Sequence, residues 1–280
     1  MHRLDARNRR YRYRLKSEGK MKKIGLLIVL IIICNVGAAW ADPTVKEILQ
    51  KVSDNQKAIA TMKATIYATW KVPAENLEKT DKIYYYYKAP DKERKELISS
   101  VAPYSILQVD IVNGDTMGLI DWKGRTFVRS MQEYSTSENI PGHMDYIDNI
   151  DDFLLNYDVS IDSATTDSLN GIYGLMAKTK PKSATIEGSG NEYFKKVLTQ
   201  VDYNKGIIIT EKVYDENDKL LIDAANSDII QIDNKYWIAR EILTKSTDSD
   251  GYEIQHIEKY EDIVLDQVIS DTLFELPIVE

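Results

Sequence analysis

The side chains that most often carry out chemistry are sparse and scattered in this sequence. His143 follows Pro141-Gly142 in an expected loop, and His256 lies in an expected strand. The sequence contains no H-x-x-x-H pair, no G-x-S-x-G nucleophile elbow and no phosphate-binding P-loop. We therefore interpret both histidines as ordinary surface or strand residues. The sequence predicts no catalytic residue and a protein that is not an enzyme.

Clusters of carboxylates are the remaining candidates for catalysis or metal binding. They lie within residues 148–152, 215–218 and 248–250. The third cluster begins like a calcium-binding loop, but no Glu follows at the position that an EF-hand requires. No substrate-binding pattern accompanies a carboxylate pair of the glycosidase type. We interpret these residues as solvated turns of an acidic protein, and we predict neither a metal nor a cofactor.

The unusual side chains are aromatic. The chain has 18 Tyr but only 4 Phe and 4 Trp, and residues 84–87 form a run of four tyrosines. In a strand, two of these four rings share one face and two share the other. The inward pair could simply belong to the core. It could instead line an apolar cavity whose ligand has both apolar and polar parts.

The N-terminal region has the parts of a secretory signal peptide. A basic start at Met21 precedes the apolar residues 24–36 (IGLLIVLIIICNV), and small residues follow at Ala39 and Ala41. That order predicts cleavage directly after Ala41 and export of the remaining chain. The apolar run is short for a membrane span, although an uncleaved anchor is the alternative. We expect translation from Met21, with residues 1–20 as an upstream extension.

Cleavage would change the charge and the cysteine content. Residues 1–41 hold ten of the 36 Lys and Arg and two of the 44 Asp and Glu, which leaves 26 basic and 42 acidic residues and a net charge of −16. Such a charge argues against a nucleic-acid partner, because phosphate binding needs a basic face. Cys34, the only cysteine, is lost with the signal. The remaining residues, 42–280, must therefore be stabilised by a core, without a disulfide.

A helix followed by strands is predicted after the signal. Thr44 and Glu47 form a capping-box pattern ahead of apolar residues at helical spacing. Apolar residues also recur at helical spacing in 144–157. Strands are predicted at 64–72, 82–88, 93–99, 106–112, 116–122, 125–130, 173–179, 196–203, 207–214, 219–224, 228–232, 236–244 and 252–260.

An Asn-Gly pair marks the strongest hairpin. With Asn113 and Gly114 as the two turn residues, Ile111 faces Thr116 and Val109 faces Gly118. Leu107, Ile120 and Trp122 share that face. It is more apolar than the opposite face, so we expect it to point inwards.

These elements predict an α+β protein that is mostly antiparallel β. No repeat and no long linker divides residues 42–280, which indicates one domain. A single sheet of about eleven strands is expected to curl. Helices would cover its concave face.

The order of several weak motifs resembles the LolA-like periplasmic lipoprotein carriers and the wider group of outer-membrane lipoprotein-sorting proteins. These motifs are the helix DPTVKEILQKV (42–52), IYYYYKAPDKER (83–94), NGDTMGLID (113–121), VDYNKGIII (201–209) and the ending ISDTLFELP (269–277). The similarity spans most of residues 42–277. It implies a curved half-barrel with a helical lid and an apolar cavity for acyl chains of lipoproteins or lipids.

The resemblance also implies ligand-binding residues. The expected cavity lining comprises Tyr84, Tyr86, Leu107, Val109, Ile111, Gly118, Ile120, Trp122, Phe153 and Leu154. Two departures from the family bear on it. Ala89 stands where the carrier has an Arg implicated in lid closure, and Arg94 is the candidate replacement for a lid contact. Gly118 stands where the family commonly has Trp, which would widen the cavity.

Two functions follow from the resemblance. The first is a monomeric periplasmic carrier that moves acylated lipoprotein or lipid towards the outer membrane, between an inner-membrane donor complex and an outer-membrane acceptor. The second is a lipid- or lipoprotein-sensing regulator on the same half-barrel. The known sensor class has a second domain after the half-barrel, whereas this sequence closes on the family-like ending, so the carrier is favoured.

Overall fold

The computed structural model describes residues 42–99, 105–130, 150–180, 195–247 and 251–278. The expected signal peptide with Cys34, the loop at His143 and the acidic residues 248–250 lie outside these ranges. The chain divides into two units, Met1–Pro43 and Thr44–Glu280. No helix among the described residues is long and apolar enough to cross a membrane.

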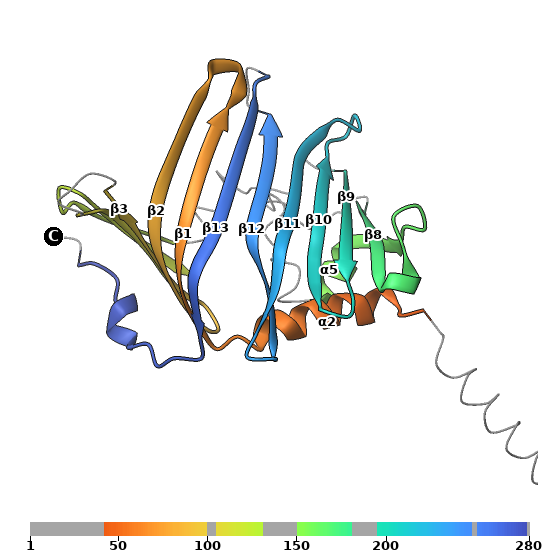
Figure 1. Cartoon of the computed structure of the whole chain (residues 1–280), viewed down its shortest axis with the longest axis horizontal. Coiled ribbons are helices and arrows are strands. Elements are labelled where there is room, and N and C mark those ends of the chain that lie inside the picture. The colour runs from red at the N-terminus through yellow and green to blue at the C-terminus, as the bar shows by residue number, and fades with distance from the viewer. Residues whose placement is uncertain (1–41, 100–104, 131–149, 181–194, 248–250, 279–280) are drawn as a thin grey trace, which may run out of the picture. The chain divides into compact units, whose positions relative to one another are not determined.

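The second unit is built on one open, curved antiparallel sheet of thirteen strands (Figure 1). The strands are β1 Thr61–Val72, β2 Leu77–Lys88, β3 Lys92–Ile98, β4 Ile106–Asn113, β5 Thr116–Asp121, β6 Thr126–Ser130, β7 Tyr157–Ile161, β8 Ile172–Thr179, β9 Lys196–Asp202, β10 Ile207–Tyr214, β11 Leu220–Ile232, β12 Tyr236–Thr247 and β13 Glu253–Leu265. Their order across the sheet is β6-β5-β4-β3-β2-β1-β13-β12-β11-β10-β9-β8-β7. Every neighbouring pair is antiparallel, so the expected mostly antiparallel α+β half-barrel is confirmed.

The N-terminal helix α2, Val45–Lys57, begins where the capping box predicts. The Thr44 side chain accepts a hydrogen bond from the Glu47 amide, and the Glu47 side chain accepts one from the Thr44 amide. These two contacts satisfy backbone donors that the first helical turn leaves unpaired. The helix then buries Ile48, Leu49 and Val52 against the sheet.

A hydrophobic cluster joins α2 to one end of the sheet. It also includes Ile150 of the short helix α5 (Ile150–Asn156), together with Tyr173, Leu175, Val201 and Ile208. Their packing removes apolar side chains of helix and sheet from water together, which stabilises both. The helices thus cover one face of the sheet near β7–β10.

The β4–β5 hairpin differs from its expected register by two residues. The turn consists of Gly114 and Asp115, so Ile111 pairs with Gly118 rather than with Thr116. Gly114 has a φ of +60°, and a glycine at the first of two turn positions is typical of a type II′ turn. A slip of two residues leaves every side chain on its expected face of the hairpin.

Two further differences concern strands. Tyr157 was expected to end a helical pattern and residues 158–161 were assigned no element, but these residues form β7 and pair with β8. The two strands expected at 219–224 and 228–232 are one strand, β11. Asp228 adopts a φ of +50° within it, and its carboxylate lies 2.7 Å from the Arg240 guanidinium on β12. Asp228 thus adopts the left-handed conformation while its neighbours Ser227 and Ile229 stay paired with β12, so the strand continues through it.

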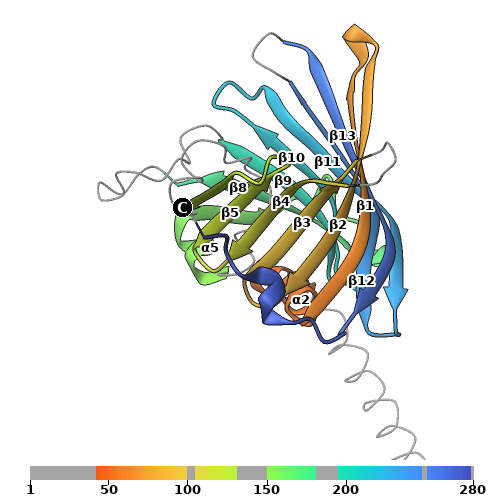
Figure 2. The ribbon, with the colours of Figure 1, turned by 90° about the vertical axis from the view of Figure 1, so that its left-hand side faces the viewer.

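The C-terminal segment, residues 267–278, lies on the sheet face opposite α2, and we call it the strap. It contains the 3₁₀ turn η4, Asp271–Phe274. Ile269 and Phe274 form a second buried cluster with Val109 and Ile111 of β4. Figure 2 shows the dark blue strap crossing β2–β5 on the near side, with α2 beyond the sheet.

Candidate functional site

Strand pairing traces one face of the sheet from the helices to the opposite edge. Leu175, which is buried with α2, begins a series of paired residues that continues through Thr199, Glu211, Ala224, Thr244, His256, Trp70 and Lys79. Further along β2, the same face carries Tyr85. Tyr85 pairs with Lys95, Lys95 pairs with Asp110, and Asp110 pairs with Leu119. We call this helix-covered concave face the inner face, and the strap-covered face the outer face.

A mixed aromatic and charged cluster lies at the middle of the inner face. Lys95 Nζ is 2.7 Å from Glu93 Oε1, and the Tyr85 hydroxyl donates to Glu93 Oε2 at 3.3 Å. The Lys95 ammonium also lies 5.8 Å from the centroid of the Tyr85 ring. These groups alternate with outward-pointing neighbours on β2 and β3, so they share one face.

The second half of this cluster comes from β13 and β1. The Tyr260 hydroxyl donates to Glu258 Oε2 at 2.8 Å. His256 stacks on Trp70 with 3.9 Å between ring centroids, and its Nε2 lies 3.9 Å from Glu258 Oε1. Aromatic surface and polar groups therefore alternate along the middle of the inner face.

Burial perturbs the acid–base properties of this cluster. Burial, reinforced by Glu93, raises the pKa of Tyr85 well above its ordinary value, and burial with Glu258 does the same to the pKa of Tyr260. Burial lowers the pKa of Lys95, but Glu93 and its neighbouring carboxylates outweigh that effect and leave the pKa raised. Lys95 therefore stays a cation at neutral pH, and both tyrosines stay neutral hydrogen-bond donors.

Burial also acts on two further groups of the inner face. It raises the pKa of Asp110, and it lowers the pKa of His256. Yet the side chains of Lys95 and Glu93 keep exposed fractions of 43% and 32%. Groups that are enclosed by protein and still reached by water are expected on a concave binding surface.

Buried side chains of β1 lie below the two tyrosines. Ala64 pairs with Tyr85, and Ile66 pairs with Tyr260. Ala64, Ile66 and Ala68 are all less than 8% exposed. The tyrosines of β2 and β13 therefore meet above β1, where alanines leave them room.

Apolar side chains extend this surface towards the β6 edge. The apolar inner-face residues of this region are Leu97, Val112, Met117, Leu119 and Phe127, and Gln108, Asp110 and Arg129 lie among them. The first four are half-buried, and Phe127 is 46% exposed. The described residues thus leave an accessible apolar surface beside the polar cluster.

Most of the expected cavity residues lie on the other face, which corrects their expected position. Tyr84, Tyr86, Val109, Ile111, Gly118 and Ile120 share the outer face. Val109, Ile111, Tyr86 and Ile120 pack against the strap. A β-carbon on Gly118 would lie 2.6 Å from Pro277 Cδ, so the strap occupies the space that this glycine was expected to add to a cavity.

The other four expected residues divide into two groups. Leu107 is 37% exposed at an irregularity in the pairing of β3 with β4, and Trp122 is 68% exposed beyond the end of β5. Phe153 and Leu154 of α5 pack against the helix-side cluster. The Phe153 and Tyr157 rings lie 4.7 Å apart.

Arg94, the candidate lid contact, binds the strap. Its Nη1 donates to the Leu273 carbonyl at 3.0 Å, and its Nε donates to Glu96 Oε1 at 2.7 Å. The Arg94 and Glu96 side chains are only 17% and 11% exposed. Arg94 therefore holds the C-terminal segment on the outer face, the face opposite α2, rather than contacting a helical lid.

Sequence reasoning left open which pair of the tyrosines 84–87 faces inwards, and it missed Lys95 and Tyr260. Lys95 pairs with Asp110, on the face of the hairpin that looked more polar. The alternation of Glu93 and Lys95 around Arg94 was a usable signal, since it places one ion pair on each face of β3. Among the described residues, no group of three or more acidic, His or Cys side chains could hold a metal.

The sequence matches no protein-family model and no curated protein, whereas the fold has clear neighbours among solved structures. A LolA superfamily protein from Nitrosomonas europaea has a TM-score of 0.56 at 14% identity, over 84% of this chain and 98% of the other. An outer membrane lipoprotein-sorting protein domain from Vibrio parahaemolyticus has a TM-score of 0.56 at 14% identity, over 81% and 95%. A DUF1329 family protein from Desulfovibrio piger has a TM-score of 0.57 at 16% identity, over 84% and 98%. The chain therefore has a LolA-like fold.

Proposed function

We propose that this protein is a periplasmic carrier that holds acyl chains of a lipoprotein or lipid on its inner face. The observation that supports this most is the accessible apolar and aromatic surface between the helix-covered strands and the β6 edge. Its likeness in fold to a lipoprotein-sorting domain adds support. The function needs binding and release, with no catalytic group.

The energetics of acyl chains explain why such a surface is required. Exposing a chain to water costs about 0.8 kcal/mol per CH₂, so a carrier must cover most of the chain during transit. Leu119 and Phe127 would contact the chain, and Phe153 and Leu154 would border it from α5. Tyr85, Lys95 and Glu258 would hydrogen-bond the polar end of the cargo.

Export belongs to the same proposal. Residues 21–41 would supply the cleaved signal, and the chain from Asp42 onwards would act in the periplasm. Cargo would arrive from an inner-membrane donor and leave to an outer-membrane acceptor. N-terminal sequencing of the protein from a periplasmic extract tests this part, and a protein that still carries residues 24–36 would contradict it.

Ligand binding is tested by two measurements on the protein expressed from the full chain. Organic extraction followed by mass spectrometry should recover lipid or lipopeptide, and a fluorescent fatty-acid probe should bind with saturation. Phe127→Asp should weaken probe binding at least tenfold, because a carboxylate would enter the apolar surface. Leu169→Asp, at an apolar residue that is 87% exposed on the 3₁₀ turn η2 (Ser168–Asn170), is the matched control and should not change it. A protein that extracts empty and takes up no probe would contradict the proposal.

A further inference from the structure

The strap is tied separately to five strands. Five backbone carbonyls of the strap accept hydrogen bonds from side chains of the sheet. The bonds run from Thr61 to Gln267 at 2.7 Å, from Lys88 to Ile269 at 3.1 Å, from Arg94 to Leu273 at 3.0 Å, from Asn113 to Phe274 at 3.2 Å and from Thr126 to Ile278 at 3.3 Å. These donors stand on β1, β2, β3, β4 and β6 in that order. The strap therefore crosses this half of the sheet and accepts a hydrogen bond from each strand between β1 and β6 except β5.

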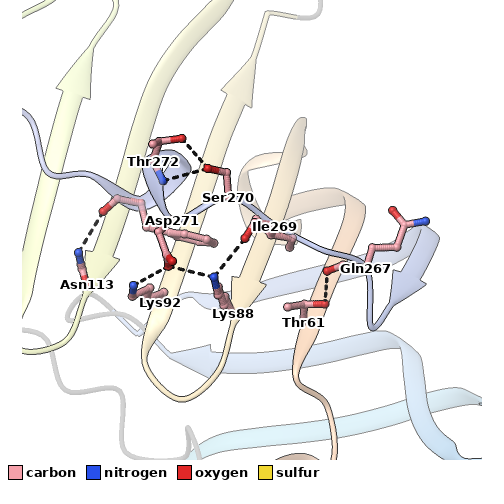
Figure 3. A network of polar contacts seen from close by, with 10 residues as sticks. Thr61, Lys88, Lys92, Asn113, Gln267, Ile269, Ser270, Asp271 and Thr272 are labelled. Carbon is pink, nitrogen blue, oxygen red and sulfur yellow. Dashed lines mark hydrogen bonds and ion pairs between the residues drawn. The ribbon is translucent and has the colours of Figure 1, made fainter.

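An ionic contact fixes the middle of the strap. Asp271 Oδ1 lies 3.0 Å from Lys88 Nζ and 2.8 Å from Lys92 Nζ, across the turn between β2 and β3 (Figure 3). Ser270 caps the short turn that presents Asp271, accepting from the Thr272 amide. Because the Asp271 side chain is 65% exposed, salt and acid can weaken this contact.

Apolar contacts continue the tie towards β5. Phe274 is fully buried and Ile269 is 4% exposed, both against Val109 and Ile111. At Gly118, the absence of a side chain lets Leu276 and Pro277 lie directly on the strand. An extended segment is thus seated closely on the outer face.

The two ends of the sheet are supported from opposite sides. Helices α2 and α5 lie against β7 and β10 on the inner face, whereas η4 lies against β3 and β4 on the outer face. Among the described residues, the strap is the second layer of the β2–β6 half. A twisted sheet needs such a layer to hold one curvature, because strand pairing alone leaves the sheet flexible.

We propose that the strap is a releasable tie that fixes the curvature of strands β2–β6 and so sets the width of the inner face. With the strap seated, Leu119 and Phe127 are held towards the aromatic cluster. With the strap detached, β3–β6 lose their apolar support and the inner face widens. In a carrier, seating would favour retention of the ligand and detachment would favour its release.

Gly118→Ala tests the tie. The added methyl would meet Pro277 Cδ at 2.6 Å, while the strand position itself accepts alanine. Hydrogen exchange should become at least tenfold faster in residues 269–276 and also in β4 and β5, with β8–β10 unchanged. Gly118→Ala/Pro277→Ala, which removes the colliding ring atoms, should restore slow exchange. Faster exchange confined to the strap, or no change, would overturn the proposal.

Asp271→Asn gives a second test with a matched control. It should speed exchange in the same segments by a smaller factor, about threefold, because the contact is exposed. Asp218 is also held by two lysines, Lys195 and Lys196, at the other end of the sheet. Asp218→Asn should leave exchange in the strap, β4 and β5 unchanged, and equal effects of both variants would overturn the proposal.

The exchange result does not depend on the proposed function. If the wild-type protein binds no fatty-acid probe, the carrier proposal fails while the exchange experiment still decides on the tie. If the probe binds, Gly118→Ala should raise its dissociation rate at least threefold, and Gly118→Ala/Pro277→Ala should reverse this. An unchanged dissociation rate despite faster exchange in β4 and β5 would show that the tie does not control the ligand, which overturns that part of the inference.

Discussion

Tyr85 of β2 and Tyr260 of β13 meet edge to face above β1, with 6.5 Å between their ring centroids and 88° between their planes. The strand between them contributes Ala64 below the rings. Each hydroxyl donates to its own carboxylate, Glu93 or Glu258. The pair therefore combines a fixed aromatic surface with polar groups at the centre of the inner face.

Truncating either tyrosine should weaken binding of a fatty-acid probe. We expect Tyr85→Ala and Tyr260→Ala each to lower affinity by about tenfold, and the double variant to lower it by less than the product, because the rings support one another. Titration of probe fluorescence measures this. Tyr67→Ala is the control, since Tyr67 lies on the outer face of β1. Equal effects at Tyr67 and Tyr85 would show that the face assignment is wrong.

Removing Arg94 alone should be more harmful than removing its whole ion pair. Arg94→Met leaves Glu96, which is 8% exposed, as a buried carboxylate without its cation. We expect the free energy of unfolding to fall by about 3 kcal/mol. Arg94→Met/Glu96→Leu should recover at least half of that loss. Urea denaturation measures both variants, and a double variant less stable than the single one would contradict the prediction.

Loss of the capping box should destabilise the helix-covered end of the sheet. Thr44→Ala removes the side chain that accepts from the Glu47 amide and should lower the free energy of unfolding by about 1 kcal/mol. The exposed hydrogen bond between Thr69 and Thr80 offers a control. Thr69→Ala should change stability by less than about 0.5 kcal/mol. Thermal or urea unfolding measures both variants, and an equal loss of unfolding free energy in the two would contradict the prediction.

Acid should loosen the strap. Hydrogen bonds and charges from Lys92 and Lys88 lower the pKa of Asp271 below its ordinary value. A depressed carboxyl pKa stabilises the folded contact above the unfolded value of about 3.9, and this stabilisation is lost as pH falls through the folded pKa. Amide exchange of residues 269–276, corrected for its intrinsic pH dependence, should therefore increase below about pH 4.

The same measurement on two variants isolates the group responsible for the acid response. Asp271→Asn should remove this increase, because the amide does not titrate. Lys195 and Lys196 lower the pKa of Asp218 in the same way, yet Asp218→Asn should leave the response of the strap intact. An unaltered acid response in Asp271→Asn would rule out Asp271 as its origin.

The sequence pattern predicted which faces are buried but not what buries them. Val109 and Ile111 lie on the more apolar face of their hairpin, and they are 6% and 1% exposed. Their partner is the strap, which is more than 150 residues away in the chain. Local alternation of apolar and polar residues carries no information about such a distant partner. The sequence therefore assigned Val109 and Ile111 to the inner face, whereas they lie on the outer face. The capping box at Thr44 was predictable because both of its residues are local.

The hairpin register shows the same limit. Asn113 is a favourable turn residue, yet it remains in β4, where its side chain donates to the Phe274 carbonyl at 3.2 Å. Gly114 instead begins the turn, and its amide donates to the Asp91 carbonyl of the neighbouring turn at 3.2 Å. Tertiary contacts therefore decided between two locally acceptable turns.

The central claim, that acyl chains bind on the inner face, is tested most directly by photocrosslinking. A fatty acid with a diazirine along its chain would be bound to the protein, irradiated, and its attachment sites mapped by mass spectrometry. We predict attachment on the inner face, at residues such as Leu119 and Phe127, and at Phe153 and Leu154 of α5. Attachment concentrated on the outer face, or none that unlabelled fatty acid competes away, would contradict the claim.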